Sequence, residues 1–489
     1  MSRPTGHLTR PATANAPSVS GPPPVASAGR RLAVVVLIVG VLMDLIDASI
    51  VNVALPTIRA DLGATGTALE WVVSAYLLAF AATLVPAGRV GDRVGRKALF
   101  LAGVALFGLA SLACGAAQDP TRLIVGRALQ GIAAGTMTPQ VLATIRAIFT
   151  GKERGAVIAV YGAVAGLAVA VGLLLGGVLT SANLAGLGWR TVFLVNVPIA
   201  IAVLIVGSLR IPETRNPGTP WPDLPGTALL VGGVVAIVYP LLEGQSLGWP
   251  PALWLVLAAG LLAIATLVWL ESRGGRAGVA LLPTTLFRTP AFAAGSGVQL
   301  LFSASLSGFS FILALWLQSG EGTSPFLAGL TAVAFSIGTI VFAPMSVGLA
   351  VKFGRWVLFV GGLLMAAGML AILVAADVGG TPFNLWLVVP GLLVAGAGLA
   401  LLVIPLTNVV MTAIPAASAG GASGVLSTAQ QLGGAMGIAL IGASFFSALP
   451  TVGFRGAFES AMTLVVAGYV ACAVLALALP RTAVAEAYE

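Results

Sequence analysis

The sequence predicts an all-α polytopic membrane protein with fourteen transmembrane helices. Of its 489 residues, 58% are hydrophobic and only 8% are charged. A soluble domain of ordinary composition carries about 25% charged residues. The mean hydropathy of +1.05 over this length indicates many membrane crossings rather than one large buried core.

Fourteen apolar segments reach the roughly 20 residues that a helix needs to cross a bilayer. We expect these helices at residues 32–56, 68–87, 98–117, 122–147, 155–180, 190–209, 225–243, 251–270, 291–318, 325–350, 356–376, 385–412, 424–448 and 457–480. Several contain prolines, which predict kinks that neighbouring helices tolerate within a membrane. These internal prolines include Pro139, Pro344, Pro390 and Pro405.

The basic residues favour one side of the membrane. If the N-terminus is cytoplasmic, the cytoplasmic segments hold 19 of the 24 lysines and arginines, and the outer loops hold four. The remaining one, Arg127, falls within the predicted helix 122–147. This positive-inside bias predicts that both termini are cytoplasmic. It also explains the net charge of +8 without a nucleic-acid partner.

A weak internal repeat divides the chain into two halves. "GRVGDRVGRKALF" (88–100) follows the second predicted helix, and "VGLAVKFGRWVLF" (347–359) follows the tenth. If the two correspond, two pseudo-symmetric six-helix bundles flank an inserted pair of helices, as in many secondary transporters. The predicted units are a disordered cytoplasmic tail rich in Pro, Ala, Ser and Thr (1–30), an N-terminal bundle (31–211), the inserted pair (212–272), a C-terminal bundle (273–480) and a cytoplasmic tail (481–489).

The chain lacks the side-chain sets of an enzyme or a metalloprotein. Cys114 and Cys472 lie in separate apolar segments, and the single histidine, His7, lies in the N-terminal tail. The glycines of "GRVGDRVG" follow a membrane helix rather than a strand, which argues against a phosphate-binding loop. We therefore expect no enzyme activity, no metal, and no cofactor beyond a proton as coupling ion.

Two aspartates lie within the first predicted helix, in "MDLIDASIVNVALP" (43–56). Asp44 and Asp47 are three residues apart, so they lie about 60° apart on one helix face. A carboxylate near the bilayer centre costs roughly 2.5–3.5 kcal/mol, and such acids typically face a cavity or pair with another group. The other acidic residues in or near the predicted helices lie at helix ends or in loops: Glu70, Glu243, Glu271, Glu321, Asp377 and Glu459.

Five motifs follow one another along the chain: "LIDASIVNVALPTI" (45–58), "GRVGDRVGRKALF" (88–100), "RLIVGRALQGIAAG" (122–135), "GWRTVFLVNVPIA" (188–200) and "GGASGVLSTAQQLGGAMG" (420–437). Together they resemble the major facilitator superfamily, and within it the fourteen-helix drug:proton antiporter family. The resemblance covers about residues 32 to 480. It implies the major facilitator fold, with six, two and six helices, and alternating access between the two halves.

The resemblance also implies that the first and fourth helices line one cavity. Asp47 is 16 residues from Arg31, and Arg127 is 19 residues from Arg146, about 24 and 28 Å along a helix. Because the depths are similar, we predict an Asp47–Arg127 ion pair or water-bridged network. We assign Asp47 as the proton site, Arg127 as the group that tunes it, and Asp44 as a contributor to proton or substrate binding. The alternative is that one aspartate only bonds a neighbouring serine or backbone group.

The motif between the second and third helices resembles the family's inner gate. Its glycines allow a tight turn, and its basic residues hold the loop in the cytoplasm. The resemblance implies that Asp92 contacts the start of the helix at 424–448 when the cavity opens outward, and leaves it when the cavity opens inward. The alternative is a surface ion pair with Arg93 or Arg96. The predicted gate residues are Gly88, Gly91, Asp92, Arg93, Gly95, Arg96 and Lys97.

One element departs from the family pattern. The Gly-Pro-x-x-Gly-Gly element associated with antiport is here "GLLLGG", with Leu173 in place of the proline. Gly172, Gly176 and Gly177 still predict close helix packing.

The second half has no acidic residue in the middle of its predicted helices. We expect it to supply apolar and aromatic surface to a cavity that accepts lipophilic molecules of varied shape. The alternative for these side chains is packing or lipid contact. Candidate lining residues are Gln130 of the first half with Phe302, Phe309, Trp316, Met411, Gln430 and Gln431.

These observations favour proton-coupled efflux of lipophilic, in some cases cationic, small molecules such as drugs and antibiotics. Proton symport or uniport of a small metabolite is the alternative, and Leu173 is its best argument. A sensor that transports nothing predicts no intramembrane ion network, so Asp44, Asp47 and Arg127 argue against it. The expected partners are a small-molecule substrate and the lipid bilayer around a monomer. Arginine outnumbers lysine 21 to 3, which indicates a GC-rich bacterial gene and predicts the inner membrane.

Overall fold

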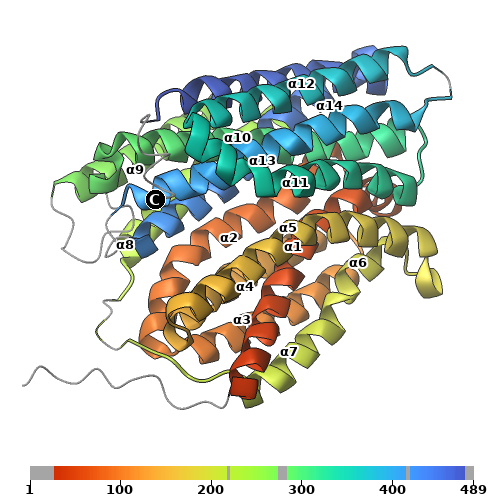
Figure 1. Cartoon of the computed structure of the whole chain (residues 1–489). Coiled ribbons are helices and arrows are strands. Elements are labelled where there is room, and N and C mark those ends of the chain that lie inside the picture. The colour runs from red at the N-terminus through yellow and green to blue at the C-terminus, as the bar shows by residue number, and fades with distance from the viewer. Residues whose placement is uncertain are drawn as a thin grey trace, which may run out of the picture.

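The protein is a bundle of long α-helices that run side by side (Figure 1). The computed structural model describes residues 27–479 except 217, 219, 220, 274–283, 381 and 415–418. The predictions for residues 1–26 and 480–489 lie outside the described residues. The prediction that the disordered tail extends to residue 30 is wrong, because residues 27–30 begin α1 (Ser27–Leu62). No proline lies between Pro24 and Pro56, so none opposes helix formation at residues 27–30.

The helices of the first half begin with the caps that their sequences favour. The side chains of Thr65 and Asp119 accept hydrogen bonds from the backbone of Ala68 and Arg122, and Pro120 fits the first turn of its helix. The elements after α1 are α2 (Gly66–Val94), α3 (Arg96–Gly115), α4 (Pro120–Ile148), α5 (Gly151–Ala182), the 3-10 turns η1 (Leu184–Gly186) and η2 (Gly188–Arg190), α6 (Thr191–Leu194) and α7 (Asn196–Arg210).

The inserted pair and the second half follow in the predicted order. The inserted helices are α8 (Leu224–Leu247) and α9 (Pro251–Ser272). The second half comprises η3 (Thr284–Arg288), α10 (Pro290–Leu315), the π-helical turn η4 (Trp316–Gly320), α11 (Pro325–Phe353), α12 (Trp356–Val378), η5 (Leu385–Val388), α13 (Val389–Thr412) and α14 (Ala419–Ala476).

The number of candidate membrane helices differs from the prediction. Within the described residues, twelve helices are long and apolar enough to cross a membrane, whereas the sequence predicted fourteen. α4 is not among the twelve, because polar residues such as Arg127, Gln130 and Gln140 reduce its apolar character. α14 counts once although its 58 residues correspond to about 87 Å, far more than the roughly 30 Å of a bilayer core.

α14 consists of two helices that meet at Gly453, where φ is 70° and ψ is −177° and the helical conformation is interrupted. The first part of α14 runs parallel to α10, because higher residue numbers in α10 contact higher numbers there. The second part runs antiparallel to α10, because higher residue numbers in α10 contact lower numbers there. The two parts of α14 therefore run antiparallel. The contacts that show this are Gly433 with Leu300, Gly437 with Ala304, Gly468 with Ser305, and Leu475 with Gly297.

The predicted glycine contacts of α5 are confirmed. A Cβ atom on Gly176 would lie 2.8 Å from the carbonyl oxygen of Ile50 in α1, and Gly172 lies equally close to α1. A Cβ atom on Gly177 would lie 2.8 Å from the carbonyl oxygen of Pro325 in α11. α5 therefore connects the first half to the second through backbone contacts that a side chain would prevent.

A second seam between the halves runs along α2 and the first part of α14. At one end of this seam, Gly66 lies against the ring of Phe446. The inserted helix α8 packs on both helices, and its Val234 lines a small apolar cavity together with Leu78 of α2 and Leu432 of α14. α8 therefore covers the seam.

Gly176→Ala should destabilise the protein by about 1–3 kcal/mol, because the new Cβ atom forces α5 away from α1. Thermal unfolding in detergent measures this change. Gly162→Ala on the same helix is the matched control: a Cβ atom there meets nothing within 4 Å, and alanine favours the helix. Equal destabilisation by both variants would contradict the close α1–α5 contact.

Candidate functional site

A buried ion pair joins α1 to α4. Asp47 and Arg127 form it, and their side chains are 0% and 1% exposed. The Asp47 carboxylate also accepts hydrogen bonds from Asn196 Nδ2 at 2.8 Å and Gln130 Nε2 at 3.1 Å. Arg127 Nε donates to the carbonyl oxygen of Val72 at 3.1 Å. The predicted pairing of Asp47 with Arg127 is present, and it connects α1, α2, α4 and α7.

Polar side chains surround the ion pair. Gln130 accepts a hydrogen bond from Arg127 Nη1 at 2.9 Å and donates to Ser111 Oγ at 2.7 Å. Cys114 Sγ lies 3.4 Å from Gln130 Oε1. Gln130 was predicted to line the cavity, but it is fully buried. The reason is that the amide supplies both a donor and an acceptor to the ion-pair network, which holds it inside the bundle.

Asp44 belongs to the same network through Tyr76. The Tyr76 hydroxyl donates to Asp44 Oδ1, and the Arg127 guanidinium lies 4.2 Å from the centre of the Tyr76 ring. Thr138 Oγ1 donates to Asp44 Oδ2 at 3.1 Å. Asp44 is only 4% exposed. Both aspartates thus bond side chains of other helices, so the alternative of a purely local serine or backbone partner does not describe this structure.

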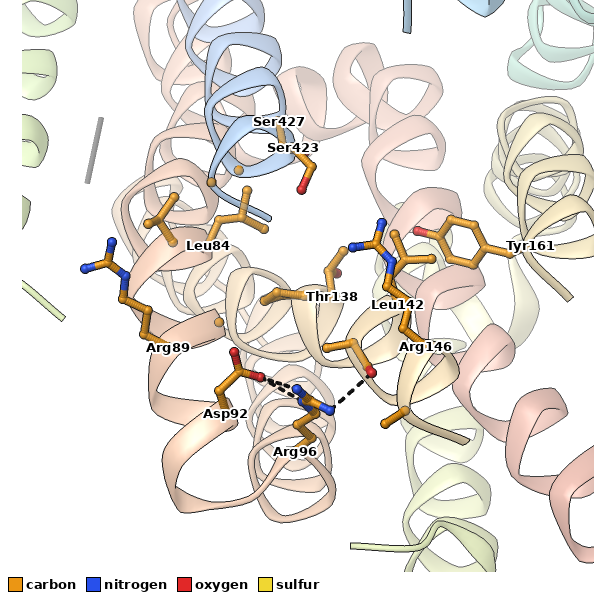
Figure 2. A pocket seen from close by; sticks show the side chains of 17 residues that line it. Leu84, Arg89, Asp92, Arg96, Thr138, Leu142, Arg146, Tyr161, Ser423 and Ser427 are labelled. Carbon is orange, nitrogen blue, oxygen red and sulfur yellow. Dashed lines mark hydrogen bonds and ion pairs between the residues drawn. The ribbon is translucent and has the colours of Figure 1, made fainter. Parts of the chain in front are cut away.

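A cavity of about 640 Å³ lies at the end of the bundle where the motif 88–97 joins α2 to α3, here called the motif end. Figure 2 shows side chains of α2, α4, α5 and α14 around it. Thr138 lines this cavity and also bonds Asp44. One hydroxyl group therefore connects the cavity wall to the buried acids.

Asp92 faces the cavity but bonds within its own motif. Arg96 Nε donates to Asp92 Oδ1 at 2.7 Å, and Arg96 Nη1 donates to the carbonyl oxygen of Ala143 at 3.3 Å (Figure 2). Gly421 and Gly424, near the start of α14, line the same cavity. The alternative contact of Asp92, an ion pair with Arg96, is therefore the one formed. The predicted contact with the helix start is absent among the described residues while this end of the bundle holds an open cavity.

The remaining motif residues anchor the turn between α2 and α3. Gly95 has φ of 140°, and Glu213 accepts hydrogen bonds from the backbone of Lys97 at 3.1 Å and of Ala98 at 3.3 Å. The Arg93 guanidinium lies 4.7 Å from the centre of the Trp221 ring. A Cβ atom on Gly91 would overlap the side chain of Gln140, and one on Gly88 would lie 3.7 Å from Pro139. The motif thus fixes the ends of α2, α3 and α4 relative to one another.

The predicted lining residues of the second half do not line this cavity. Trp316 is fully buried and stacks on Phe458, with ring centres 4.3 Å apart. Its place in the π-helical turn η4 directs it into an aromatic cluster. Phe302 and Phe309 are buried, Met411 and Gln431 are half-buried, and Gln430 is exposed. α14 contributes small residues to the cavity instead: Gly421, Ser423, Gly424 and Ser427.

Sequence reasoning missed three partners of the acids. They are Tyr76, Thr138 and Asn196. Because these side chains are uncharged, a search for charged residues in apolar helices does not find them. Asn196 lies within the motif "GWRTVFLVNVPIA", and its amide in an apolar stretch was the available signal. Tyr76 lies one turn after Val72, whose carbonyl oxygen binds Arg127.

The family model described as Major Facilitator Superfamily matches residues 37–226 and 224–438. The chain belongs to the major facilitator superfamily. It is 39% identical to a probable actinorhodin transporter of Streptomyces coelicolor, over 88% of this chain and 75% of that protein. It is 36% identical to a puromycin resistance protein of Streptomyces alboniger, over 83% of this chain and 80% of that protein.

The chain is also 34% identical to a tetracenomycin C resistance and export protein of Streptomyces glaucescens, over 83% of this chain and 74% of that protein. Among solved structures, an autoinhibited peptide transporter of the POT family matches with a TM-score of 0.65 and 15% sequence identity, over 91% of this chain and 96% of that chain. At this identity the match shows the fold alone.

Asp47→Asn and Arg127→Gln should each destabilise the protein by about 3–5 kcal/mol, because each leaves a buried partner without its counter-charge or hydrogen bonds. The double variant should be less destabilised than the sum of the two, since it leaves no uncompensated charge. Thermal unfolding in detergent of the wild type, both single variants and the double variant measures the coupling. Additive effects would contradict a direct ion pair.

Proposed function

We propose that this protein exports lipophilic antibiotic-like small molecules in exchange for protons. The observation that carries the proposal is the continuous polar chain from the cavity to the buried ion pair. It runs from Thr138 to Asp44, then to Tyr76, and from there to Arg127 and Asp47. A proton on Asp47 would compete with Arg127 for the carboxylate. Thr138 and Tyr76 form a hydrogen-bonded route from the cavity to Asp44, and the Tyr76 ring contacts Arg127, so a change in charge at either aspartate acts on the other.

The coupling follows from electrostatics. With Asp47 ionised, the ion pair holds α1 and α4 together; a proton on Asp47 weakens that attraction and leaves Arg127 with Gln130 and Val72 as partners. The network therefore has two arrangements that differ by one proton. Alternating access then links proton binding on one side of the membrane to substrate release on that side.

The substrate class is supported by the relatives and by the cavity. Three relatives are named for actinorhodin, puromycin and tetracenomycin C, which supports antibiotics as substrates here. A volume of about 640 Å³ is within the range of pockets for drug-sized ligands. Arg89, Arg96 and Arg146 line the cavity with a single carboxylate, Asp92.

The proposal includes membership of the fourteen-helix drug:proton antiporter family. Counting α4 as a crossing and α14 as two raises the twelve candidate helices to fourteen, and the antiparallel parts of α14 support this count. The excess of basic residues at the motif end supports a cytoplasmic location for it. On this topology the protein is a monomer in the bacterial inner membrane with both termini in the cytoplasm.

The inner-gate role of Asp92 is part of the proposal. Asp92 and the start of α14 lie on the wall of one cavity, so closing the motif end would bring them together. Asp92 would then exchange Arg96 for the backbone N–H groups at the start of α14. The open cavity corresponds to the inward-facing state.

Proton symport or uniport on the same fold is the second candidate. The observation that favours it is Leu173, which replaces the proline of the antiport element. The Leu173 carbonyl oxygen faces Gly329 of α11, so this position lies at the contact between the halves, where a change in backbone geometry would alter coupling.

Asp47→Asn should abolish substrate-driven proton movement while retaining substrate binding. Proteoliposomes with an internal pH indicator measure the proton flux when puromycin, actinorhodin or tetracenomycin C is added under an imposed pH gradient. The wild type should export substrate as protons enter. Proton movement that persists with substrate in Asp47→Asn would contradict the assignment, and co-directional flux in the wild type would favour symport.

Thr138→Val should slow proton-coupled export by about tenfold or more, because it removes the hydroxyl that joins the cavity to Asp44. Thr136→Val is the matched control. Thr136 lies two residues earlier on α4, and its hydroxyl donates to the carbonyl oxygen of Ile132 in its own helix. Initial rates of proton flux in proteoliposomes compare the two variants. Equal rates for both would show that the Thr138 hydroxyl is not part of the route.

A further inference from the structure

A buried carboxyl group lies at the end of the α2–α14 seam opposite the motif. Glu70 of α2 is only 2% exposed, although the sequence placed it at a helix end. Its carboxyl group lies against Gly442 of α14, where a Cβ atom would overlap Glu70 Oε1. Within the described residues, no hydrogen bond or ion pair to this carboxyl group is formed. An ionised carboxylate is costly in such a place.

A second carboxyl group, on the inserted helix α8, acts on Glu70. Glu243 is the charged group whose electrostatic interaction reaches the Glu70 carboxyl group. Glu243 accepts hydrogen bonds from Trp71 Nε1 at 2.8 Å and from Ser246 Oγ at 2.9 Å. Glu243 therefore has two hydrogen-bond donors, whereas Glu70 has none among the described residues. A buried carboxyl group without donors is less costly when it carries a proton.

The other helices packed against α2 bring no counter-charge to Glu70. The first part of α14, from Ala419 to Val452, contains no charged residue, and the charged residues of α3, Arg96 and Lys97, lie at the motif end. On α4, Arg127 pairs with Asp47 and Arg122 pairs with Asp119. Two charged residues of α1 lie near this end of the seam, and each contacts a group other than Glu70. Those are Arg59, over the Phe446 ring at 5.8 Å, and Asp61, paired with Arg190.

Glu70 is buried at the end of the seam that is closed in this structure. In this structure the cavity lies at the motif end, while Gly66 and Glu70 contact Phe446 and Gly442 at the opposite end. Alternating access requires this opposite end to open, which separates α2 from α14. Glu70 then loses its contact with Gly442 and becomes accessible from the other side of the membrane.

We propose that Glu70 is a second proton-binding site, which takes up a proton when the α2–α14 seam closes at the end opposite the motif and releases it when the seam opens. Glu243 bonds Trp71, the residue next to Glu70, and so gives the inserted helix α8 a role in closure. The proposal rests on the proposed function only for alternating access, because it does not require Asp47 to carry the transported proton. Protons outside the cell would then favour the closed seam.

Distance measurements between spin labels at Thr67→Cys on α2 and Ser447→Cys on α14 test this proposal. The native Cys114 and Cys472 are fully buried, so labels attach at the two introduced positions. In lipid nanodiscs, raising the pH should move the wild type from a short to a longer distance. Glu70→Gln should keep the short distance at every pH. Glu243→Gln should open at a lower pH than the wild type, because a neighbouring negative charge is removed.

Two further variants keep the result interpretable. Glu70→Asp retains a titratable carboxyl group and should retain a pH-dependent transition. Glu321→Gln, a neutralised acid in the segment between η4 and α11, should behave as the wild type. A pH-dependent opening that is unchanged in Glu70→Gln, or a wild-type distance that does not respond to pH, would overturn the proposal.

The two proton sites can be distinguished from each other. Asp47→Asn should lose coupled proton flux in proteoliposomes yet keep the pH-dependent opening of the seam. Glu70→Gln should show the reverse: protons still move with substrate, at a lower rate, while the pH-dependent opening is lost. Loss of opening in Asp47→Asn together with unchanged opening in Glu70→Gln would assign the pH response to the ion pair instead.

Discussion

The buried ion pair between Asp47 and Arg127 determines how the helices of the first half must pack. Removing a carboxylate and a guanidinium from water costs several kcal/mol per ion, and their attraction offsets this only when the remaining donors and acceptors are bonded. Asn196, Gln130 and the carbonyl oxygen of Val72 supply those bonds. Four helices must therefore meet at one point, and α4 must carry polar residues that make it the least apolar of the long helices.

The two halves of the bundle contribute different groups to the cavity and to the network around it. The first half holds the ion pair, Asp44 and most of the cavity wall, including Thr138 and Tyr161. The second half contributes small residues of α14, which allow close approach and separation at the seam. Backbone contacts at Gly176 and Gly177 hold α5 between α1 and α11. α5 therefore links α1, the helix that carries Asp47, to the second half through direct backbone contacts.

The sequence predicted those residues of the site whose burial in the membrane is costly, because a charged side chain in an apolar helix can be recognised from that helix alone. Intramembrane acids and a single intramembrane arginine stand out from an apolar background. Similar depth, together with the family resemblance that places the first and fourth helices side by side, predicted the pairing of Asp47 with Arg127. The sequence could not predict the environment of Glu70, because its burial depends on Gly442, more than 370 residues later in the chain. Trp316 was misassigned for a similar reason, since its aromatic partner Phe458 comes from the second part of α14.

The most direct test of the central claim is proton release on substrate binding in detergent solution, where no gradient or leak contributes. A weakly buffered solution with a pH indicator reports the protons released when substrate is added to wild type and to Asp47→Asn. The account predicts release that saturates with substrate in the wild type and is absent in Asp47→Asn. Equal release from both proteins, or substrate binding to wild type without release, would contradict Asp47 as the group that exchanges a proton for substrate.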